Sequence, residues 1–188
     1  IDAIAWEFTE KAKILENGEY VFRAPNEANV DYYYKSIGKQ RSQYAKHIEP
    51  VTFYEFLKDK GVKNIARIAS FPTHSLRALN AMIDLGFMNK EEIQVNGVSI
   101  KPLDFTTEVL RRIPVPEGYT EKENLFLKVF GTKDKQPLTI EMDCVAGTQV
   151  GWEEATCNVD TGFPAAILAE MIKNGQITER GFSVPELT

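Results

Sequence analysis

The residues that most often bind metal ions are few in this sequence and lie far apart. It has two histidines, His47 and His74, and two cysteines, Cys144 and Cys157. A zinc site needs ligands at short, regular spacings, and neither histidine has a cysteine nearby, so we expect no metal site. Nothing makes the cysteines a necessary pair, and the simpler interpretation is a reducing compartment.

The motifs that hold phosphates or activate a nucleophile are also absent. The sequence lacks a Walker loop, a G-x-S-x-G elbow and an H-E-x-x-H helix. The nearest approach to a dinucleotide fingerprint, "GTQVG" at 147–151, has the wrong spacing. Taken alone, the residues suit a domain that shapes a substrate site or mediates an interaction better than a complete enzyme.

The charge pattern argues against nucleic-acid and membrane partners. Carboxylates outnumber cations, and the net charge is −5. The densest basic stretch, residues 32–47, interleaves aromatic residues with cations. A nucleic-acid groove normally draws on basic residues from several places, so we interpret this stretch as a solvated connecting segment. No apolar run approaches the roughly 20 residues of a membrane span, and the first residues do not resemble a signal peptide. We expect a cytoplasmic protein.

The elements that must position any site mix strands and helices, which indicates an α+β fold. Two Asn-Gly pairs, at 17–18 and 96–97, suit the positive φ angles of tight hairpin turns. Residues 138–144, "LTIEMDC", alternate strictly between apolar and polar side chains and predict a strand with one wet face. Residues 124–131 precede it across a polar loop, so we expect an antiparallel hairpin. Residues 25–49 carry no clear assignment.

Three segments in the middle of the chain carry helix signals. A capping box of Thr52 and Glu55 predicts a helix that ends at Gly61. A second helix should run over 73–86 and stop at its final glycine. A third, over 104–113, must end before the proline that follows it.

The closing stretch, "TGFPAAILAEMIKNGQITERGFSVPEL" at 161–187, predicts a helix that packs closely against a neighbour. Asp160 or Thr161 would cap it, Pro164 would lie in its first turn and Gly175 would end it. Small alanine side chains lie on part of its surface, beside a broad apolar stripe. They would allow a neighbouring segment to approach the helix backbone closely. The pattern alone favours a helix docked on the chain's own core.

This same stretch resembles the C-terminal signature of the saccharopine dehydrogenase family, which includes saccharopine reductases and lysine 6-dehydrogenases. Three earlier segments are similar to the family's motifs, in the family's order: "FPTHSLRALNAMIDLGF", "VNGVSIKPLDFTTEVL" and "LFLKVFGTKDKQPLTIEMD". The resemblance covers about residues 65–186, and its last motif is the most specific.

The resemblance implies a fold and a domain organisation. Family members have an N-terminal Rossmann domain, then a catalytic and dimerisation domain whose final helix returns to the Rossmann unit. In this chain, residues 1–158 would form the substrate-binding and dimerisation domain, and 159–188 a helical segment that packs on a missing Rossmann domain. We therefore expect a mixed, largely antiparallel sheet with helices on one face, and a homodimer. An excised segment would explain the absent glycine motif and initial Met.

The implied chemistry is hydride exchange between NAD or NADP and a carbon that bears an amine, in a saccharopine- or lysine-like amino acid or conjugate. This role belongs to lysine metabolism. The cofactor would be bound mainly by the absent Rossmann domain, so we expect the isolated chain to be inactive. In this chain the cofactor contacts would come from Thr161, Gly162, Phe163 and Pro164. The resemblance identifies no catalytic acid or base.

On the substrate side, such a reaction needs a cation for the carboxylate and a group that handles the amine proton. Many relatives carry Arg directly before an aromatic-Pro pair, whereas here Ser70 precedes Phe71 and Pro72. Arg67 is the candidate clamp, or else a strand residue that points to solvent. His74 matches the family's histidine, and it either acts at the substrate site or is a structural residue at a helix N-terminus.

Near the start of the chain, Trp6, Phe8 and Thr9 resemble residues that line the substrate side in relatives. The alternative is that the aromatic residues belong to the core. Two functions of different class stay open: the substrate domain of an NAD(P)-dependent oxidoreductase, or a non-catalytic binding or dimerisation module that keeps the fold. Ser70 in place of Arg favours the module, and the retained closing helix favours the enzyme.

Overall fold

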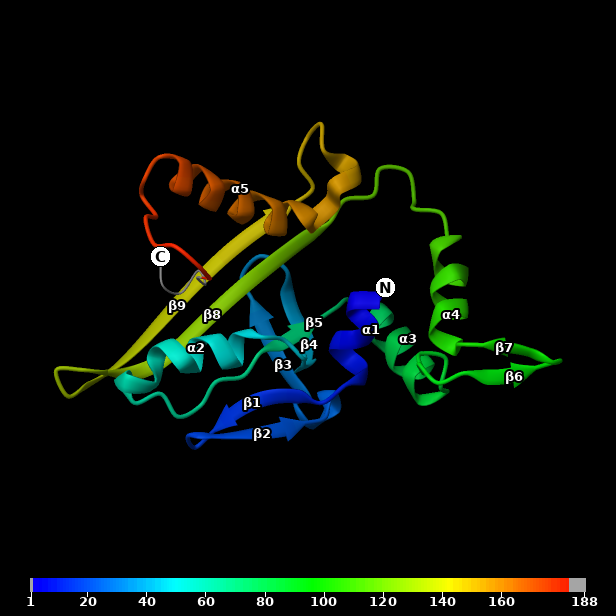
Figure 1. Cartoon of the computed structure of the whole chain (residues 1–188), viewed down its shortest axis with the longest axis horizontal. Helices are drawn as coiled ribbons and strands as arrows, with labels where there is room; N and C mark the ends of the chain where they lie inside the picture. Colours follow the sequence, from blue (N-terminus) through cyan, green and yellow to red (C-terminus); the bar gives the residue numbers. More distant parts are fainter. Residues whose placement is uncertain (1, 183–188) are drawn as a thin grey trace. The chain divides into compact units, whose positions relative to one another are not determined.

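The chain divides into two units in the computed structural model, which describes residues 2–182 (Figure 1). The described part of the first unit is 2–32 and 40–115, and that of the second is 33–39 and 116–182. Helices and strands occur in both units, which confirms the α+β class. Within the described residues the strands pair in four small sheets, each of two or three strands.

The first unit opens with α1 (Asp2–Thr9) and a hairpin of β1 (Ala12–Glu16) and β2 (Glu19–Arg23). Asn17 and Gly18 form the turn between the strands, with φ angles of 52° and 88°. Positive φ at both positions is the backbone of a two-residue hairpin turn, so the prediction from this Asn-Gly pair is confirmed.

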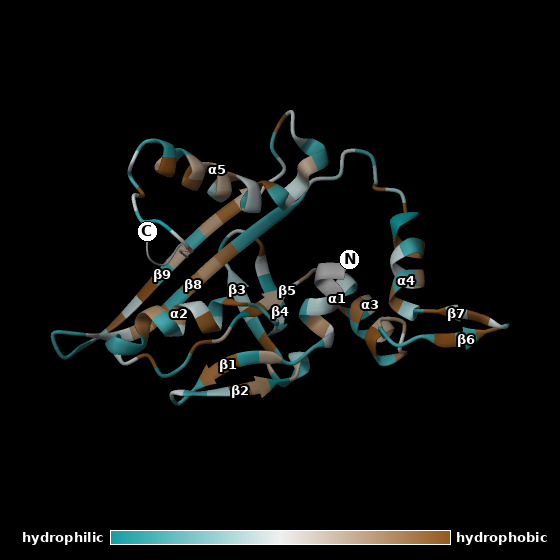
Figure 2. Ribbon diagram, viewed as in Figure 1, coloured by the Kyte–Doolittle hydropathy of each residue, from teal (hydrophilic) through white to brown (hydrophobic). Residues whose placement is uncertain are grey.

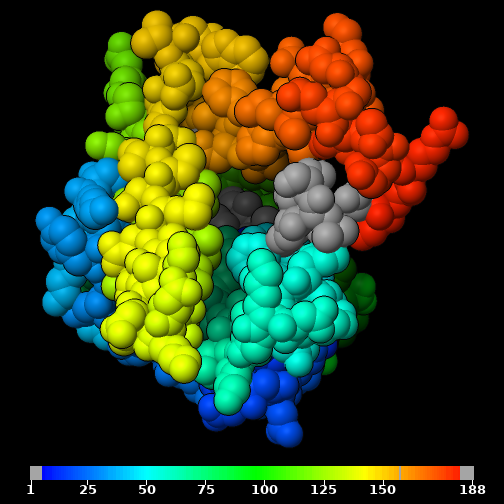
Figure 3. Space-filling view, turned by 90° about the vertical axis from the view of Figure 1, so that its left-hand side faces the viewer, coloured from blue at the N-terminus to red at the C-terminus, as the bar shows by residue number. Residues whose placement is uncertain are grey.

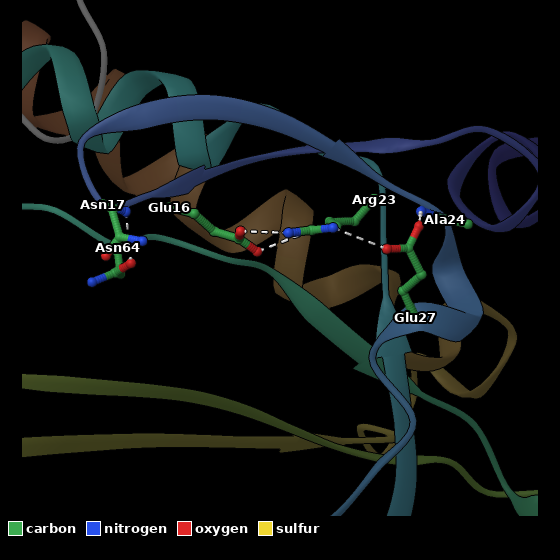
Figure 4. Close-up of polar contacts among 6 residues, drawn as sticks. All are labelled: Glu16, Asn17, Arg23, Ala24, Glu27 and Asn64. Atoms are coloured by element: carbon green, nitrogen blue, oxygen red, sulfur yellow. Dashed lines mark hydrogen bonds and ion pairs between the residues drawn. The ribbon is translucent and has the colours of Figure 1, made fainter.

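A polar clamp holds the hairpin at both ends (Figure 4). Arg23 lies 2.6 Å from Glu16 on the facing strand and 3.2 Å from Glu27 in the 3-10 turn that follows. Glu27 also accepts a 2.7 Å hydrogen bond from the Ala24 amide. At the other end, Asn64 Oδ1 accepts a 3.0 Å hydrogen bond from the turn. Polar contacts therefore attach both ends of the hairpin to neighbouring segments of the chain.

Three strands form the second sheet, in the order β3 (Val30–Tyr34), β4 (Gly38–Tyr44) and β5 (Ile68–Ser70). The central strand, β4, pairs antiparallel with β5. β3 and β4 occupy much of the stretch that the sequence left unassigned. The tip between them, residues 33–39, belongs to the second unit.

The helix α2 (Glu49–Leu57) begins earlier than the capping box predicted. Pro50 lies in its first turn, where the fixed φ of proline favours a helix and its missing N–H costs nothing. Thr52 is therefore inside the helix, and its hydroxyl donates to the Glu49 carbonyl at 3.4 Å. At the other end a short 3-10 turn stops at Gly61, with φ 75°, as predicted.

Two helices and a hairpin complete the first unit: α3 (Thr73–Asp84), β6 (Ile93–Val95), β7 (Val98–Ile100) and α4 (Pro102–Arg111). Gly86, with φ 81°, follows α3 as its predicted stop. Asn96 and Gly97 form the predicted turn between β6 and β7. The helix α4 ends before Pro114, also as predicted.

The core of the first unit is a cluster of buried side chains from five segments: Phe8, Ala45, Leu79, Met88 and Leu103. The ring of Phe8 lies 5.5 Å from that of Phe71, which directly follows β5. Burying a side chain of this size stabilises a fold by about 1.5–3 kcal/mol. Phe8 therefore fastens α1 to the rest of the unit.

A long two-stranded ribbon and one helix make up most of the second unit. β8 (Lys122–Lys133) and β9 (Gln136–Gly147) pair antiparallel along their whole length, which confirms the predicted hairpin. The ribbon turns at Asp134 and Lys135, which both have positive φ. α5 (Val159–Lys173) comes later in the chain, and Figure 3 shows β9 in yellow and α5 in orange at the surface.

The tip between β3 and β4 contacts the ribbon through a polar network inside the second unit. Ser36 Oγ donates to Asn124 Oδ1 at 3.0 Å, and Asn124 Nδ2 donates to Asp143 Oδ1 at 3.2 Å. Lys35 Nζ lies 3.2 Å from the other oxygen of Asp143. The hydrogen bond from Asn124, followed by that from Lys35, lowers the pKa of Asp143. This network joins the tip to both strands of the ribbon.

One face of the ribbon is apolar over its central part, and Figure 2 shows the alternation of hydropathy along both strands. The register places seven apolar side chains on this face, which we call the apolar ribbon face: Leu125, Leu127, Val129, Leu138, Ile140, Met142 and Cys144. The six other than Cys144 are 39–61% exposed. The opposite face carries an ion pair of Lys128 and Glu141 at 2.7 Å. The predicted alternation is present, but the apolar face is only partly covered within the described chain.

The start of α5 differs from the prediction. Asn158 is the N-cap, and Pro164 lies inside the helix rather than in its first turn. A 3-10 turn, Glu153–Asn158, runs directly into α5, so helical structure begins before Asp160 or Thr161 can cap it. The end agrees with the prediction, since Gly175 follows the helix with φ 69°.

Replacing Gly18 by Ala should lower the free energy of unfolding by about 1 kcal/mol, because a β-carbon disfavours a φ of 88°. Crowding is not the cause, since no heavy atom lies within 4 Å of the place a β-carbon would take. Gly18→Asn should cost clearly less, because Asn tolerates this backbone region. Urea unfolding followed by circular dichroism compares the two variants. Equal losses would contradict the backbone explanation.

Candidate functional site

Arg67 lies just before β5, and its guanidinium contacts α1. Nη1 donates to Glu7 Oε2 at 3.1 Å, and the Arg67 carbonyl accepts a 3.2 Å hydrogen bond from the Ala45 amide. The next amide, of Lys46, donates to the Glu7 carbonyl at 3.0 Å. Among the described residues the rest of the guanidinium makes no hydrogen bond. Glu7 therefore holds Arg67 at one nitrogen and leaves its other donors available.

Glu10, directly after α1, accepts hydrogen bonds from two lysines. Lys46 Nζ contacts Glu10 Oε2, and Lys90 Nζ lies 2.7 Å from Glu10 Oε1. Lys46 Nζ also lies 4.4 Å from the centre of the Trp6 ring. The hydrogen bond from Lys46, and then that from Lys90, lowers the pKa of Glu10 to about 2. A carboxylate shared by two ammonium groups stays ionised far into acid.

The three residues predicted on the N-terminal segment all lie on α1, but in different surroundings. Trp6 is 38% exposed and forms one side of the charged surface at Lys46. Phe8 is only 2% exposed and belongs to the core, as the alternative interpretation of the aromatic residues had it. Thr9 is half-buried at the end of the helix. Trp6 alone of the three therefore faces solvent beside a cation.

His74 lies in the first turn of α3 and is exposed. No contact to its ring connects it with Arg67 or with α1 in the part of the chain that the structure describes. Ser70, where many relatives have Arg, is a strand residue paired with Ser42. The structure therefore joins Arg67 and Trp6 through Glu7 and Lys46, and leaves His74 apart from this group.

The residues predicted for the cofactor lie in the second unit, near the start of α5. Thr161, Gly162, Phe163 and Pro164 are all exposed. The ring of Phe163 lies 6.1 Å from that of Trp152. They form an open surface on a helix rather than a pocket.

Sequence reasoning missed four charged residues that surround Arg67 and Trp6: Glu7, Glu10, Lys46 and Lys90. Lys46 belongs to the basic stretch that was interpreted as a solvated connecting segment. The only available signal was that two carboxylates, Glu7 and Glu10, lie three residues apart in one segment. This spacing does not reveal their distant partners.

Two depressions of the surface are not lined by Arg67, Trp6 or the lysines, although one of them includes Ala66, the residue before Arg67. The larger, of about 390 Å³, is lined by parts of β1, Tyr44 and residues 64–66, and the second, of about 340 Å³, by residues 120–122 and 145–148. Among residues 2–182 no group of His, Cys, Asp or Glu is placed to hold a metal ion. No helix in that part of the chain is long and apolar enough to cross a membrane.

The small antiparallel sheets and their helices define an α+β domain with a charged surface at one end of α1. A family model described as the saccharopine dehydrogenase C-terminal domain matches residues 2–188, and the chain belongs to this family. The resemblance seen in the sequence is thereby confirmed, and it extends over nearly the whole chain. No curated protein matches the sequence. The chain is thus the C-terminal domain of an oxidoreductase family.

Replacing Glu10 by Gln should lower the melting temperature at about pH 7 and have little effect near pH 2. The folded-state pKa of about 2 lies below the ordinary 4.5, so ionised Glu10 stabilises the fold above that ordinary value. This contribution is lost as the pH falls from about 4.5 toward 2. Thermal unfolding across this range measures it.

Glu91→Gln is the matched control, because Glu91 is exposed and has no ion pair among the described residues. It should change the melting temperature little at either pH. An effect of Glu10→Gln that is the same at pH 7 and at pH 2 would show that the ion pairs are not its cause.

Proposed function

We propose that the chain is the substrate-binding and dimerisation part of an NAD(P)-dependent oxidoreductase that acts on a C–N bond. Its substrate is an amino acid or an amino-acid conjugate, saccharopine- or lysine-like. Membership of the family supports the reaction class. A cytoplasmic location and a role in lysine metabolism are part of the same proposal.

The proposal rests on the hydrogen bonding and burial of the Arg67 side chain. One nitrogen of its guanidinium is fixed by Glu7 at 3.1 Å, and its side chain is only 29% exposed. Arginine binds carboxylates through two parallel N–H donors, and Arg67 keeps such an edge without a partner in the described chain. A clamp that is held in place before the substrate arrives loses less entropy on binding.

Arg67 would anchor the substrate carboxylate while the carbon that bears the amine exchanges hydride with the nicotinamide. Fixing one end of the substrate sets the distance and direction of the reacting carbon. His74, exposed in the first turn of α3, is the residue we propose for the amine end, and Trp6, Phe8 and Thr9 for the wall on the α1 side. Phe8 would act there through packing, since it is buried.

The described chain does not itself fit a dinucleotide, since it offers no glycine-rich loop whose amides could hold a pyrophosphate. We therefore assign NAD or NADP mainly to a Rossmann domain, and place the boundary of the packing segment at 158/159. Support comes from α5, whose Thr161, Gly162, Phe163 and Pro164 are exposed and whose Ile167 and Ile172 are 57% and 60% exposed. We propose that this surface packs on the Rossmann domain and contacts the cofactor.

A non-catalytic module is the second candidate. Ser70 in place of the usual Arg favours it, and so does the separation of His74 from the charged surface. The two candidates differ in what the full-length protein does with an amine substrate and NAD or NADP.

In the full-length protein, Arg67→Ala and His74→Ala should each lower kcat/KM about tenfold to hundredfold. The expected loss is that of a charge-assisted hydrogen bond, about 1.5–3 kcal/mol. Steady-state kinetics with lysine and saccharopine as substrates measure it. Arg77→Ala is the matched control, because Arg77 is exposed on α3 and has no ion pair among the described residues.

If both variants kept the wild-type kcat/KM, both site assignments would be withdrawn. If the wild type oxidised neither amine with NAD or NADP, the non-catalytic module would be the better description.

The apolar ribbon face supports the proposed dimer. Soluble monomers rarely leave a continuous apolar patch of this kind without cover, and a two-stranded ribbon is marginally stable alone. A second copy of the same face is self-complementary under a two-fold axis. We propose that the two copies pack through this face, in which Val129 and Ile140 are directly paired.

Light scattering on the chain at about 100 μM should show a dimer, since this concentration lies well above a micromolar Kd. Val129→Lys should give monomers, because it places a charge in the apolar ribbon face. Thr139→Lys, on the opposite face of the ribbon, should leave the dimer intact. The exposed Ile167 and Ile172 of α5 offer a second apolar surface, and Met171→Glu should remove only association of chains through that helix. A wild-type chain that is monomeric at this concentration would refute the dimer.

A further inference from the structure

The charged side chains around the end of α1 form a cluster of two neighbouring groups of ion pairs. Arg67 contacts Glu7, while Lys46 and Lys90 both contact Glu10. Glu7 and Glu10 lie three residues apart at the end of α1, and the Lys46 amide donates to the Glu7 carbonyl at 3.0 Å, so the two groups of ion pairs are neighbours. The cations come from three separate segments, which precede β5, follow β4 and follow α3. The tertiary fold has therefore gathered them in one place.

This cluster has more cations than carboxylates, and its cations have donors to spare. Arg67, Lys46 and Lys90 face two carboxylates, those of Glu7 and Glu10. An ammonium group has three N–H donors and a guanidinium has five. Each of the three cations makes one hydrogen bond to a carboxylate in the described chain. One more anion would restore the balance of charge and use the remaining donors.

We propose that Arg67, Lys46 and Lys90 together form a binding site for a carboxylate group of the substrate, with the ring of Trp6 as one wall. The inference rests on the proposed function and adds Lys46 and Lys90 to it. Glu7 and Glu10 are positioning residues, because they hold the cations in place without using up their donors. The side chains of Arg67 and Lys46 are 29% and 31% exposed, so solvent screens them only in part.

Ordinary surface ion pairs are the competing explanation. Such pairs contribute little to stability, and elsewhere in this unit the carboxylates are in excess, since one cation, Arg23, pairs with both Glu16 and Glu27. Here two lysines share Glu10, and Lys46 also lies 4.4 Å from the centre of an aromatic ring that is partly open to solvent. A phosphate group of the cofactor is a second possible anion, and the experiment distinguishes it from a carboxylate.

Trp6 provides a direct readout of binding. The chain has two tryptophans, Trp6 and Trp152, so a Trp152→Phe background leaves the emission of Trp6 alone. Titration with glutarate should change this emission saturably, with a Kd of roughly 1 mM. Chloride at equal ionic strength should not, and inorganic phosphate should bind more weakly than glutarate. Absence of saturation, an equal response to chloride, or a preference for phosphate would each overturn the proposal.

Variants of the cluster test which residues bind. Lys46→Met should weaken glutarate about tenfold, and Lys46→Arg, which keeps the charge, should bind close to wild type. Lys58→Met is the matched control, since Lys58 forms a 2.8 Å pair with Glu55 on α2 and should leave binding unchanged. Loss of binding in Lys58→Met, or full binding in Lys46→Met, would contradict the site.

In the full-length protein, Lys46→Met and Lys90→Met should each raise KM for the amino-acid substrate about tenfold and change kcat little. If these lysines serve only to attach α1, the melting temperature will fall and KM will stay as in the wild type, which would overturn the proposal. A wild type without NAD(P)-linked activity would refute the proposed function alone, because the glutarate titration decides this site without turnover.

Discussion

The attachment of α1 to the end of the β4–β5 ladder is the contact on which the candidate site depends. Phe8 buries its ring in the core of the first unit, and the Glu7 carbonyl accepts the Lys46 amide at 3.0 Å. These two contacts have different chemistry and the same result. The apolar one fixes the position of the helix, and the polar one fixes its rotation. With both satisfied, Glu7 and Trp6 meet the two cations that follow β4 and precede β5.

Local chemistry allowed much of the fold to be predicted. Two Asn-Gly pairs specify their hairpins because few other residues accept positive φ at both turn positions. Gly61 and Gly86 end their helical segments for the same reason. The starts of α2 and α5 were wrong where signals competed: Pro50 outweighed Thr52, and a 3-10 turn led into α5 before its expected cap.

The candidate site was less accessible from the sequence, because its charges come together only through tertiary contacts. Arg67 and Trp6 were named through the family resemblance, whereas Lys46 and Lys90 carry no motif. Glu10 and Lys90 are far apart in the chain and meet at 2.7 Å because α3 packs against the core. A pattern within one segment can reveal a hairpin or a helix, but it does not reveal which distant segments will share a carboxylate.

The tip of the β3–β4 hairpin has a consequence for how such a protein can change over evolution. Residues 33–39 belong to the second unit, while the chain on either side of them belongs to the first. The two units are therefore not consecutive modules. A single genetic recombination event at residue 115 would separate Ser36 from its partner Asn124. The β3–β4 hairpin would then meet a ribbon that comes from another protein. Recombination between relatives can exchange the ribbon freely only if the tip is inherited with it, so the two segments should be inherited as a pair although they are far apart in the gene.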